Sequence, residues 1–296
     1  MQPDAPLPAY PLIPATPPVP ANPLLAVPGL AASTLRRTWR RVVFAAFPGI
    51  CRFCDQATGQ ARDLCDHCAG DLPWLGHACH RCGMPHVAPA STCPACPRQA
   101  PSLDRTVAAF IYAPPIDRLV ADVKFHGRLT TAPLLAQLLA DAIERAYSPA
   151  RPGESCGSAG TQAEARSPDD GFPEMLVPVP LSTRRLLRRG HDQAWLLATQ
   201  VRRRLQDAGR PITFAGSTLR RVRHTAAQSG QSQDARLRSL VGAFAVRTPP
   251  RVRHVALLDD VFTTGATLDA AARALRSAGV ERVDAWVVAR TPQAVE

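Results

Sequence analysis

The sequence is poor in lysine, in aromatic residues and in long apolar runs. Only one of its 35 basic residues is a lysine, Lys124, and aromatic residues make up 5% of the chain. No stretch approaches 18 uninterrupted apolar residues, so we expect no membrane-spanning helix. Near the amino terminus no basic segment is followed by an apolar core. We therefore expect no secretory signal and a cytoplasmic location, where thiols stay reduced.

The charge of the chain indicates an anionic partner. The formal net charge is +11 over 296 residues, a balance typical of proteins that meet a phosphate-bearing substrate, nucleic acid or lipid headgroups. Nearly all of the positive charge comes from arginine, which a composition that favours arginine and alanine explains. Against that background the single lysine, Lys124, is a candidate functional residue.

Composition divides the chain into three parts. Residues 1–33 contain ten prolines and are predicted to be a disordered head, because such a segment buries too little apolar surface to offset the entropy of ordering. Residues 34–98 are predicted to hold a short helix over Thr34–Phe47 and a cysteine-rich module. The helix pattern is amphipathic, and we favour its packing against the module over binding to a membrane surface. Residues 103–292 form the third part.

Four Cys-x-x-Cys pairs repeat every 14 residues in the second part. Such a turn places two thiolates on one side of a tight knuckle, and two knuckles make a tetrahedral cage for zinc. Eight sulfurs therefore predict two structural Zn²⁺ sites, although spacing leaves open which pairs share an ion. A disulfide framework is the less favoured alternative in a reducing compartment. The predicted ligands are Cys51, Cys54, Cys65, Cys68, Cys79, Cys82, Cys93 and Cys96.

The third part alternates strand-like and helix-like runs, which is typical of an α/β domain on a mostly parallel sheet. Residues 148–173 interrupt this alternation with a segment rich in Pro, Gly, Ser and Ala, predicted to be a solvent-exposed insertion. The predicted strands are Thr106–Tyr112, Met175–Pro180, Phe214–Val222, Ala243–Val246, His254–Leu258 and Arg282–Ala289. The predicted helices are Pro115–Phe125, Ala132–Tyr147, Asp192–Ala208 and Ala266–Ala278.

Two adjacent carboxylates and a hydroxyl-rich turn follow the predicted strand at 254–258. Asp259 and Asp260 come at its carboxyl end, where α/β sheets bind ligands. The turn Thr263–Thr267 then opens a helix, whose amino end favours an anion, and Gly265 allows close approach to the backbone. The pattern predicts a site for a sugar phosphate whose vicinal hydroxyls bind the two carboxylates. An ordinary threonine-capped turn is the alternative, but it explains only one of the threonines.

This string resembles the 5-phosphoribosyl-1-pyrophosphate (PRPP) loop of type I phosphoribosyltransferases. Together with the four cysteine pairs, the chain resembles the ComF/GntX-like competence-associated family over about residues 40–292. The family usually has an aromatic residue and Asn where His191 and Asp192 stand, and Asn where Ser239 stands. Further blocks that carry the resemblance are Val123–Gly127, Val177–Pro180, Arg188–Ala194, Arg223–Gln228, Ala235–Arg238 and Gly242–Phe244.

The resemblance implies a type I phosphoribosyltransferase-like domain and a role for each matching residue. Asp259 and Asp260 would hold the ribose hydroxyls, and the block around Lys124 would lie at the pyrophosphate, where a cation is needed. Arg223 and Arg236 bracket a Gln- and Ser-rich stretch that is similar to a mobile lid. Mg²⁺ would bridge the pyrophosphate oxygens. The residues implied to bind the 5-phosphate are Thr263, Thr264, Gly265, Ala266 and Thr267.

Two classes of function follow from the resemblance. In one, the protein is an enzyme that transfers a pentosyl group from PRPP, supporting DNA uptake or processing with other competence proteins. In the other, it is a non-catalytic module that senses PRPP or binds single-stranded DNA. No motif for recognising a base is visible. The arginines at 184, 185, 188 and 189 are expected to contact nucleic acid or solvent, with substrate contact as the alternative.

Overall fold

The computed structural model describes residues 49–58, 62–86, 93, 96, 102–148, 171–222, 240 and 242–292. The predicted head, the predicted helix over Thr34–Phe47 and most of the predicted insertion lie outside these residues. The helices are α2 (Asp66–Gly70), α4 (Ile116–Phe125), η2 (Leu129–Thr131), α5 (Ala132–Tyr147), α6 (Thr183–Arg189), α7 (Gln193–Asp207) and α9 (Ala266–Ser277). The strands are β1 (Arg105–Ile111), β2 (Met175–Pro178), β3 (Thr213–Phe214), β4 (Leu219–Arg221), β5 (Phe244–Val246), β6 (His254–Phe262) and β7 (Arg282–Arg290).

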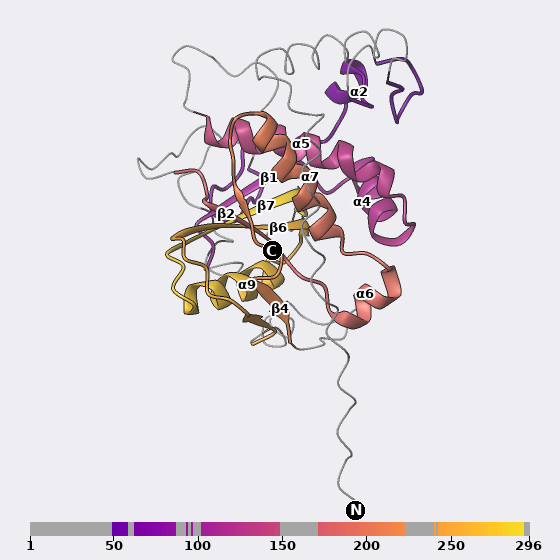
Figure 1. Cartoon of the computed structure of the whole chain (residues 1–296). Coiled ribbons are helices and arrows are strands. Elements are labelled where there is room, and N and C mark those ends of the chain that lie inside the picture. The colour runs from indigo at the N-terminus through magenta and orange to yellow at the C-terminus, as the bar shows by residue number, and fades with distance from the viewer. Residues whose placement is uncertain are drawn as a thin grey trace, which may run out of the picture.

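A five-stranded parallel sheet forms the centre of the molecule, in the order β1-β7-β6-β2-β3. Helices α5 and α7 cover one face and α9 covers the other (Figure 1). A two-stranded antiparallel sheet, formed by β4 and β5, lies beside α9. This arrangement confirms the predicted α/β class with a mostly parallel sheet and flanking helices. Among the helices of the described residues, none is both long enough and apolar enough to cross a membrane.

Strand β6 shows why these residues form a central strand. Its side chains alternate between the two apolar layers, with Ala256 and Leu258 facing the α5/α7 layer and Val255 and Leu257 facing the α9 layer. A strand buried on both faces needs a continuous apolar run, which is the pattern that parallel sheets show. The length of the apolar run in β6 therefore determines where along the strand its first polar residues lie.

Three differences from the sequence-based predictions affect elements that line the pocket described below. Strand β6 does not end at Leu258 but continues to Phe262, because β7 pairs with it as far as Phe262 and Arg290. The predicted strand Phe214–Val222 is two strands in different sheets, separated by a turn in which the Thr218 amide donates to the Ala215 carbonyl. Helix α6 was not predicted, because its sequence lacks an apolar stripe and Leu187 remains 80% exposed.

The cysteine-rich module docks on the edge of the sheet. The Leu75 amide donates to the Ala109 carbonyl at 3.0 Å, and the Ile111 amide donates to the Pro73 carbonyl at 2.8 Å. Trp74 forms an antiparallel bridge with Phe110, and the two rings lie 4.5 Å apart. The module thus pairs with β1 and covers an edge that would otherwise expose backbone donors and acceptors.

Candidate functional site

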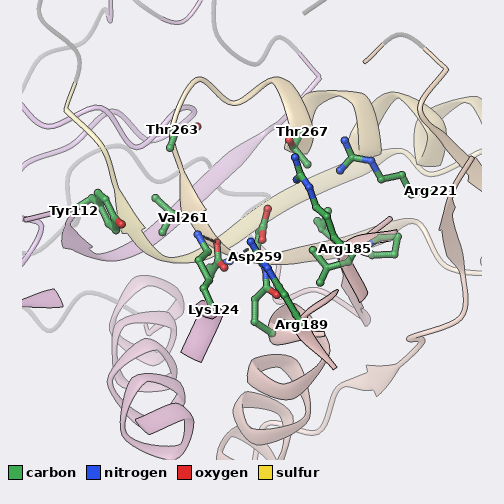
Figure 2. Close-up of a pocket in the computed structure, with 14 residues that line it drawn as sticks. Tyr112, Lys124, Arg185, Arg189, Arg221, Asp259, Val261, Thr263 and Thr267 are labelled. Atoms are coloured by element: carbon green, nitrogen blue, oxygen red, sulfur yellow. Dashed lines mark hydrogen bonds and ion pairs between the residues drawn. The ribbon is translucent and has the colours of Figure 1, made fainter. Parts of the chain in front are cut away.

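A pocket of about 260 Å³ opens at the carboxyl ends of the parallel strands. This is the edge at which open α/β sheets bind ligands. Figure 2 shows basic side chains from several elements converging on the acidic pair at the end of β6. The lining residues are Tyr112, Lys124, Val179, Pro180, Leu181, Arg185, Arg189, Gln193, Arg221, Asp259, Asp260, Val261, Thr263 and Thr267.

Asp259 and Asp260 lie within strand β6, near its carboxyl end, and their two carboxyl groups have different surroundings. Burial raises the pKa of Asp259 to about 7, the charge of Asp260 adds to the rise, and Lys124 opposes it. The Asp260 amide donates to Asp259 Oδ1 at 2.8 Å. Asp259 therefore changes its protonation state near neutral pH, and it can accept a proton or two hydroxyl hydrogen bonds there.

Lys124 reaches the acidic pair from the end of α4. Its Nζ lies 2.9 Å from Asp260 Oδ1, and the two side chains are 19% and 7% exposed. The second carboxylate oxygen of Asp260 is buried without a hydrogen-bond partner among the described residues. The same holds for the side-chain oxygen of Gln193, which is itself 4% exposed. These two buried oxygens of the pocket are therefore available to accept hydrogen bonds from a ligand or to coordinate a cation.

The turn between β6 and α9 presents helix-start amides beside the carboxylates. Gly265 is the N-cap of α9 and adopts a left-handed φ of 79°, which glycine tolerates without strain. The first helical bond runs from the Asp269 amide to the Gly265 carbonyl at 2.8 Å. The amides of the residues before Asp269 lie in the first turn of α9, where a helix offers its backbone donors no intrahelical acceptor. Such amides can donate to an anion. Thr263 is exposed and Thr267 half-buried, so the turn is open to the pocket.

Helix α6 contributes to the pocket through two of its four arginines. Arg185 and Arg189 line it, whereas Arg184 and Arg188 are exposed outside it. Burial lowers the pKa of Arg189, and the nearby carboxylates of Asp260 and Asp259 oppose that shift. The sequence pattern alone left all four arginines equivalent, and the helical register of α6 separates them.

His191 and Asp192, which differ from the usual pattern of the family that the sequence resembles, make hydrogen bonds around the start of α7. Asp192 caps α7, accepting at Oδ1 from the Trp195 amide at 3.1 Å, and accepts at Oδ2 from the Leu181 amide at 3.1 Å. Nε2 of His191 lies 2.6 Å from the Val123 carbonyl, one residue before Lys124. His191 and Asp192 therefore position both sides of the pocket without lining it.

The predicted site residues fall into two groups. Lys124, Asp259, Asp260, Thr263 and Thr267 line one pocket, with Thr264, Gly265 and Ala266 in the turn between them. Arg223 and Arg236 lie outside the described residues. Sequence reasoning missed the pocket roles of Tyr112, Gln193 and Arg221, because only the fold brings them to the carboxylates.

The eight predicted ligand cysteines form two clusters from consecutive pairs. Within each cluster the four Sγ atoms lie within 4.8 Å of one another. Cys54 Sγ and Cys65 Sγ are 3.7 Å apart, and Cys82 Sγ and Cys93 Sγ are 3.5 Å apart. A tetrahedral Zn–S bond of about 2.3 Å separates sulfurs by about 3.8 Å. The clusters therefore fit two structural zinc ions, and interleaved pairs do not occur. The clusters are Cys51, Cys54, Cys65 and Cys68, and Cys79, Cys82, Cys93 and Cys96.

Comparison with known proteins supports both halves of this architecture. Residues 42–97 match the family model of a double zinc ribbon domain, and residues 192–296 match that of a phosphoribosyl transferase domain. The first match overlaps the two cysteine clusters, and the second includes α7, β6, the turn at 263–267 and α9.

Several known proteins align with most of this chain and with nearly all of their own length. DNA utilization protein YhgH of Salmonella typhimurium is 32% identical over 82% of this chain and 98% of its own length. Competence protein F of Haemophilus influenzae is 33% identical over 77% of this chain and 90% of its own. The Escherichia coli K12 YhgH protein is 30% identical over 90% of this chain and all of its own. The chain therefore belongs to the ComF/GntX-like family, in which a double zinc ribbon precedes a phosphoribosyltransferase domain.

Proposed function

We propose that this protein binds PRPP with Mg²⁺ in the pocket at the end of β6. The observation that carries the proposal is that adjacent carboxylates, an anion-binding turn and several cations line the same 260 Å³ pocket. PRPP would offer its ribose hydroxyls to the carboxylates, its 5-phosphate to the turn and its pyrophosphate to the cations. Inorganic phosphate or a nucleobase alone would leave one of these groups without a partner.

Each part of PRPP has matching residues. The ribose hydroxyls donate to Asp259 and Asp260, and the 5-phosphate accepts from the amides and hydroxyls of the turn Thr263–Thr267. The pyrophosphate lies among the cations Lys124, Arg185 and Arg189. Oδ2 of Asp260 and the amide oxygen of Gln193, which have no hydrogen-bond partner among the described residues, are hard oxygen ligands. Such ligands suit Mg²⁺ or its bound waters. Mg²⁺ would neutralise charge on the pyrophosphate.

In the catalytic version of the proposal, the protein transfers the pentosyl group to an acceptor. The bond from C1 of the ribose to pyrophosphate breaks with its electron pair leaving on oxygen, and an acceptor lone pair forms the new bond to C1. Lys124, Arg185 and Arg189 stabilise the charge on the leaving group. Asp259, whose pKa burial raises to about 7, would accept the acceptor's proton as a general base. Arg223 and Arg236 stay predicted lid residues.

The proposed biological role is support of DNA uptake or DNA processing in the cytoplasm. It rests on the names of the relatives, DNA utilization protein and Competence protein F, and on the formal net charge of +11. Single-stranded DNA and other competence proteins are the proposed macromolecular partners. The acceptor of the pentosyl group would then be a component of nucleic acid metabolism.

Isothermal titration with PRPP and Mg²⁺ tests the binding proposal. We expect one site per chain, and loss of binding in Asp260→Asn, because an amide cannot supply the charge that pairs with Lys124 and Mg²⁺. The matched control is Asp117→Asn, which alters a half-buried carboxylate in the first turn of α4 that does not line the pocket. Binding that survives Asp260→Asn unchanged would reject the assignment.

A non-catalytic function is the second candidate. It is favoured by the arginines of α6 that lie outside the pocket, Arg184 and Arg188, beside the exposed Leu187. In that case the protein would sense PRPP or bind single-stranded DNA without transferring the pentosyl group. Pyrophosphate release with candidate bases and with DNA separates the two versions. DNA affinity that falls steeply with salt is expected if phosphate contacts dominate, and a flat salt response would remove the DNA role.

A further inference from the structure

A buried arginine joins the second cysteine cluster to the turn of the pocket. Arg290, the last residue of β7, is fully buried. Its Nε donates to the carbonyl of the zinc-ligand residue Cys82 at 2.9 Å. Its Nη1 donates to the carbonyls of Phe262 at 3.1 Å and Thr263 at 2.6 Å, where the turn begins. One guanidinium group thus contacts backbone on both sides of the boundary between the ribbon and the pocket.

The positive charge of Arg290 is opposite in sign to that of the thiolate cluster beside it. Four thiolates around one Zn²⁺ leave a net negative charge. Burial lowers the pKa of Arg290, and the thiolates of Cys82, Cys93, Cys79 and Cys96 oppose that shift. An arginine stays protonated even under such a shift. A buried cation needs a nearby anion, so the metal-loaded second cluster stabilises Arg290 in the position from which it holds the turn.

Packing around Arg290 leaves little room for another arrangement. Its guanidinium lies 4.3 Å from the centre of the Phe262 ring. Gly83, in the knuckle after Cys82, has a left-handed φ of 64°, and a side chain there would come within 3.0 Å of Thr106 and 3.7 Å of Arg290. The Thr106 amide also donates to the His80 carbonyl at 2.8 Å. The knuckle, Arg290 and the turn therefore form one packed unit.

We propose that Arg290 is a positioning residue that couples the second cysteine cluster to the turn Thr263–Thr267, so that metal in this cluster sets the affinity of the turn for a phosphate group. This coupling rests on the proposed function for its ligand, but its structural half concerns only the turn and the cluster. The first cluster is the built-in comparison, because the hydrogen bond that Arg290 makes to a cysteine among the described residues goes to the second cluster.

Hydrogen exchange tests the structural half without any ligand. Cys96→Ser weakens metal binding at the second cluster, and Cys68→Ser is its matched control at the first, since both are half-buried last ligands. We expect faster exchange of the amides of residues 262–268 in Cys96→Ser than in Cys68→Ser, with one zinc ion per chain left in each variant. Equal exchange of the turn in the two variants, with those zinc contents, would overturn the coupling.

Ligand affinity tests the other half. Arg290→Met keeps the bulk of the side chain but loses its hydrogen bonds, and we expect Mg-PRPP affinity to fall about tenfold or more, as for lost charged hydrogen bonds. Arg105→Met is the control, because Arg105 is equally buried at the opposite end of the sheet and donates to the Ala146 carbonyl. We expect wild-type affinity in that variant. Equal losses in both variants, or none in Arg290→Met, would overturn the proposal.

These measurements distinguish failure of the proposed function from failure of the coupling. If the wild-type chain does not bind Mg-PRPP, the proposed function fails, while the exchange comparison still decides the coupling. If Arg290→Met does not fold, Arg290→Lys takes its place, because lysine keeps the charge beside the thiolates but cannot donate to both sides of the boundary. We expect Arg290→Lys to retain both zinc ions and lose affinity, and wild-type affinity in it would contradict the positioning role.

Discussion

Nζ of Lys124 lies 2.9 Å from Oδ1 of Asp260, so the single lysine of the chain is paired with an acidic residue of the pocket. The two residues come from different elements, the end of α4 and the end of β6. Because the pair is largely buried, removing either partner would leave the other charge without compensation. We expect a pyrophosphate group that enters the pocket to pair with Lys124 in place of Asp260, and Mg²⁺ to bind Asp260 in place of Lys124.

Amine labelling can follow Lys124 directly, because no other lysine exists in the chain. We expect Mg-PRPP to slow acylation of Lys124 several-fold, since the pyrophosphate would cover an ammonium group that is now 19% exposed. Mass spectrometry of the labelled peptide measures the rate, and the α-amino group in the same sample serves as the control. Equal rates with and without saturating ligand would place the pyrophosphate elsewhere.

The raised pKa of Asp259 predicts a pH-dependent stability. Because its pKa is about 7 in the folded chain and ordinary in the unfolded chain, the folded state holds its proton more tightly, and stability falls as the pH rises towards 7. Asp259→Asn removes this penalty. We expect the variant to melt at least about 3 °C above wild type at pH 8.5, with a smaller gap at pH 5.5. A gap that does not change with pH would contradict the shift.

Two glycines with left-handed backbone flank α9 and provide a matched pair. Gly265 begins the helix with φ 79°, and Gly279 follows its end with φ 96°. Alanine at either position costs about 1–2 kcal/mol of backbone strain, so both variants should lose similar stability in urea denaturation. Only Gly265→Ala should also weaken Mg-PRPP binding, because only that glycine lies in the turn. Equal affinity of the two variants would argue against a phosphate at the turn.

Asp192 allows a test of the residue that departs from the family pattern. Asp192→Ala removes the N-cap of α7 and should cost about 1 kcal/mol in urea denaturation. Asp192→Asn keeps an acceptor for the Trp195 amide but loses the second oxygen, which accepts from the Leu181 amide, so we expect a smaller loss of stability than in Asp192→Ala and unchanged ligand binding. If Asp192→Asn destabilised the chain as much as Asp192→Ala, the negative charge rather than the cap would be the important feature.

How much the sequence predicts depends on how local the signal is. The cysteine repeat and the string from Asp259 to Thr267 predict their elements, because each depends on neighbours in the chain. The extension of β6 to Phe262 depends on pairing with β7, which no local pattern reports. Helix α6 lacks an apolar stripe, and its arginines gain different roles only after the helix is placed against the pocket.

The residues that complete the pocket were the least predictable. Arg221 comes from β4 in the small two-stranded sheet, and Gln193 begins α7 as one polar residue among many in the sequence. Arg290 comes directly after the predicted strand Arg282–Ala289, and its contacts reach Cys82, far away in the chain. Such long-range polar contacts follow from the tertiary fold and carry no periodic signal.

A crystal soaked with Mg-PRPP gives the most direct test of the pocket assignment. We expect the 5-phosphate at the amides of residues 263–267, the ribose hydroxyls within hydrogen-bond distance of Asp259 and Asp260, and the pyrophosphate beside Lys124. Clear density for the ligand at another surface, with this pocket unchanged at saturating concentration, would contradict the assignment.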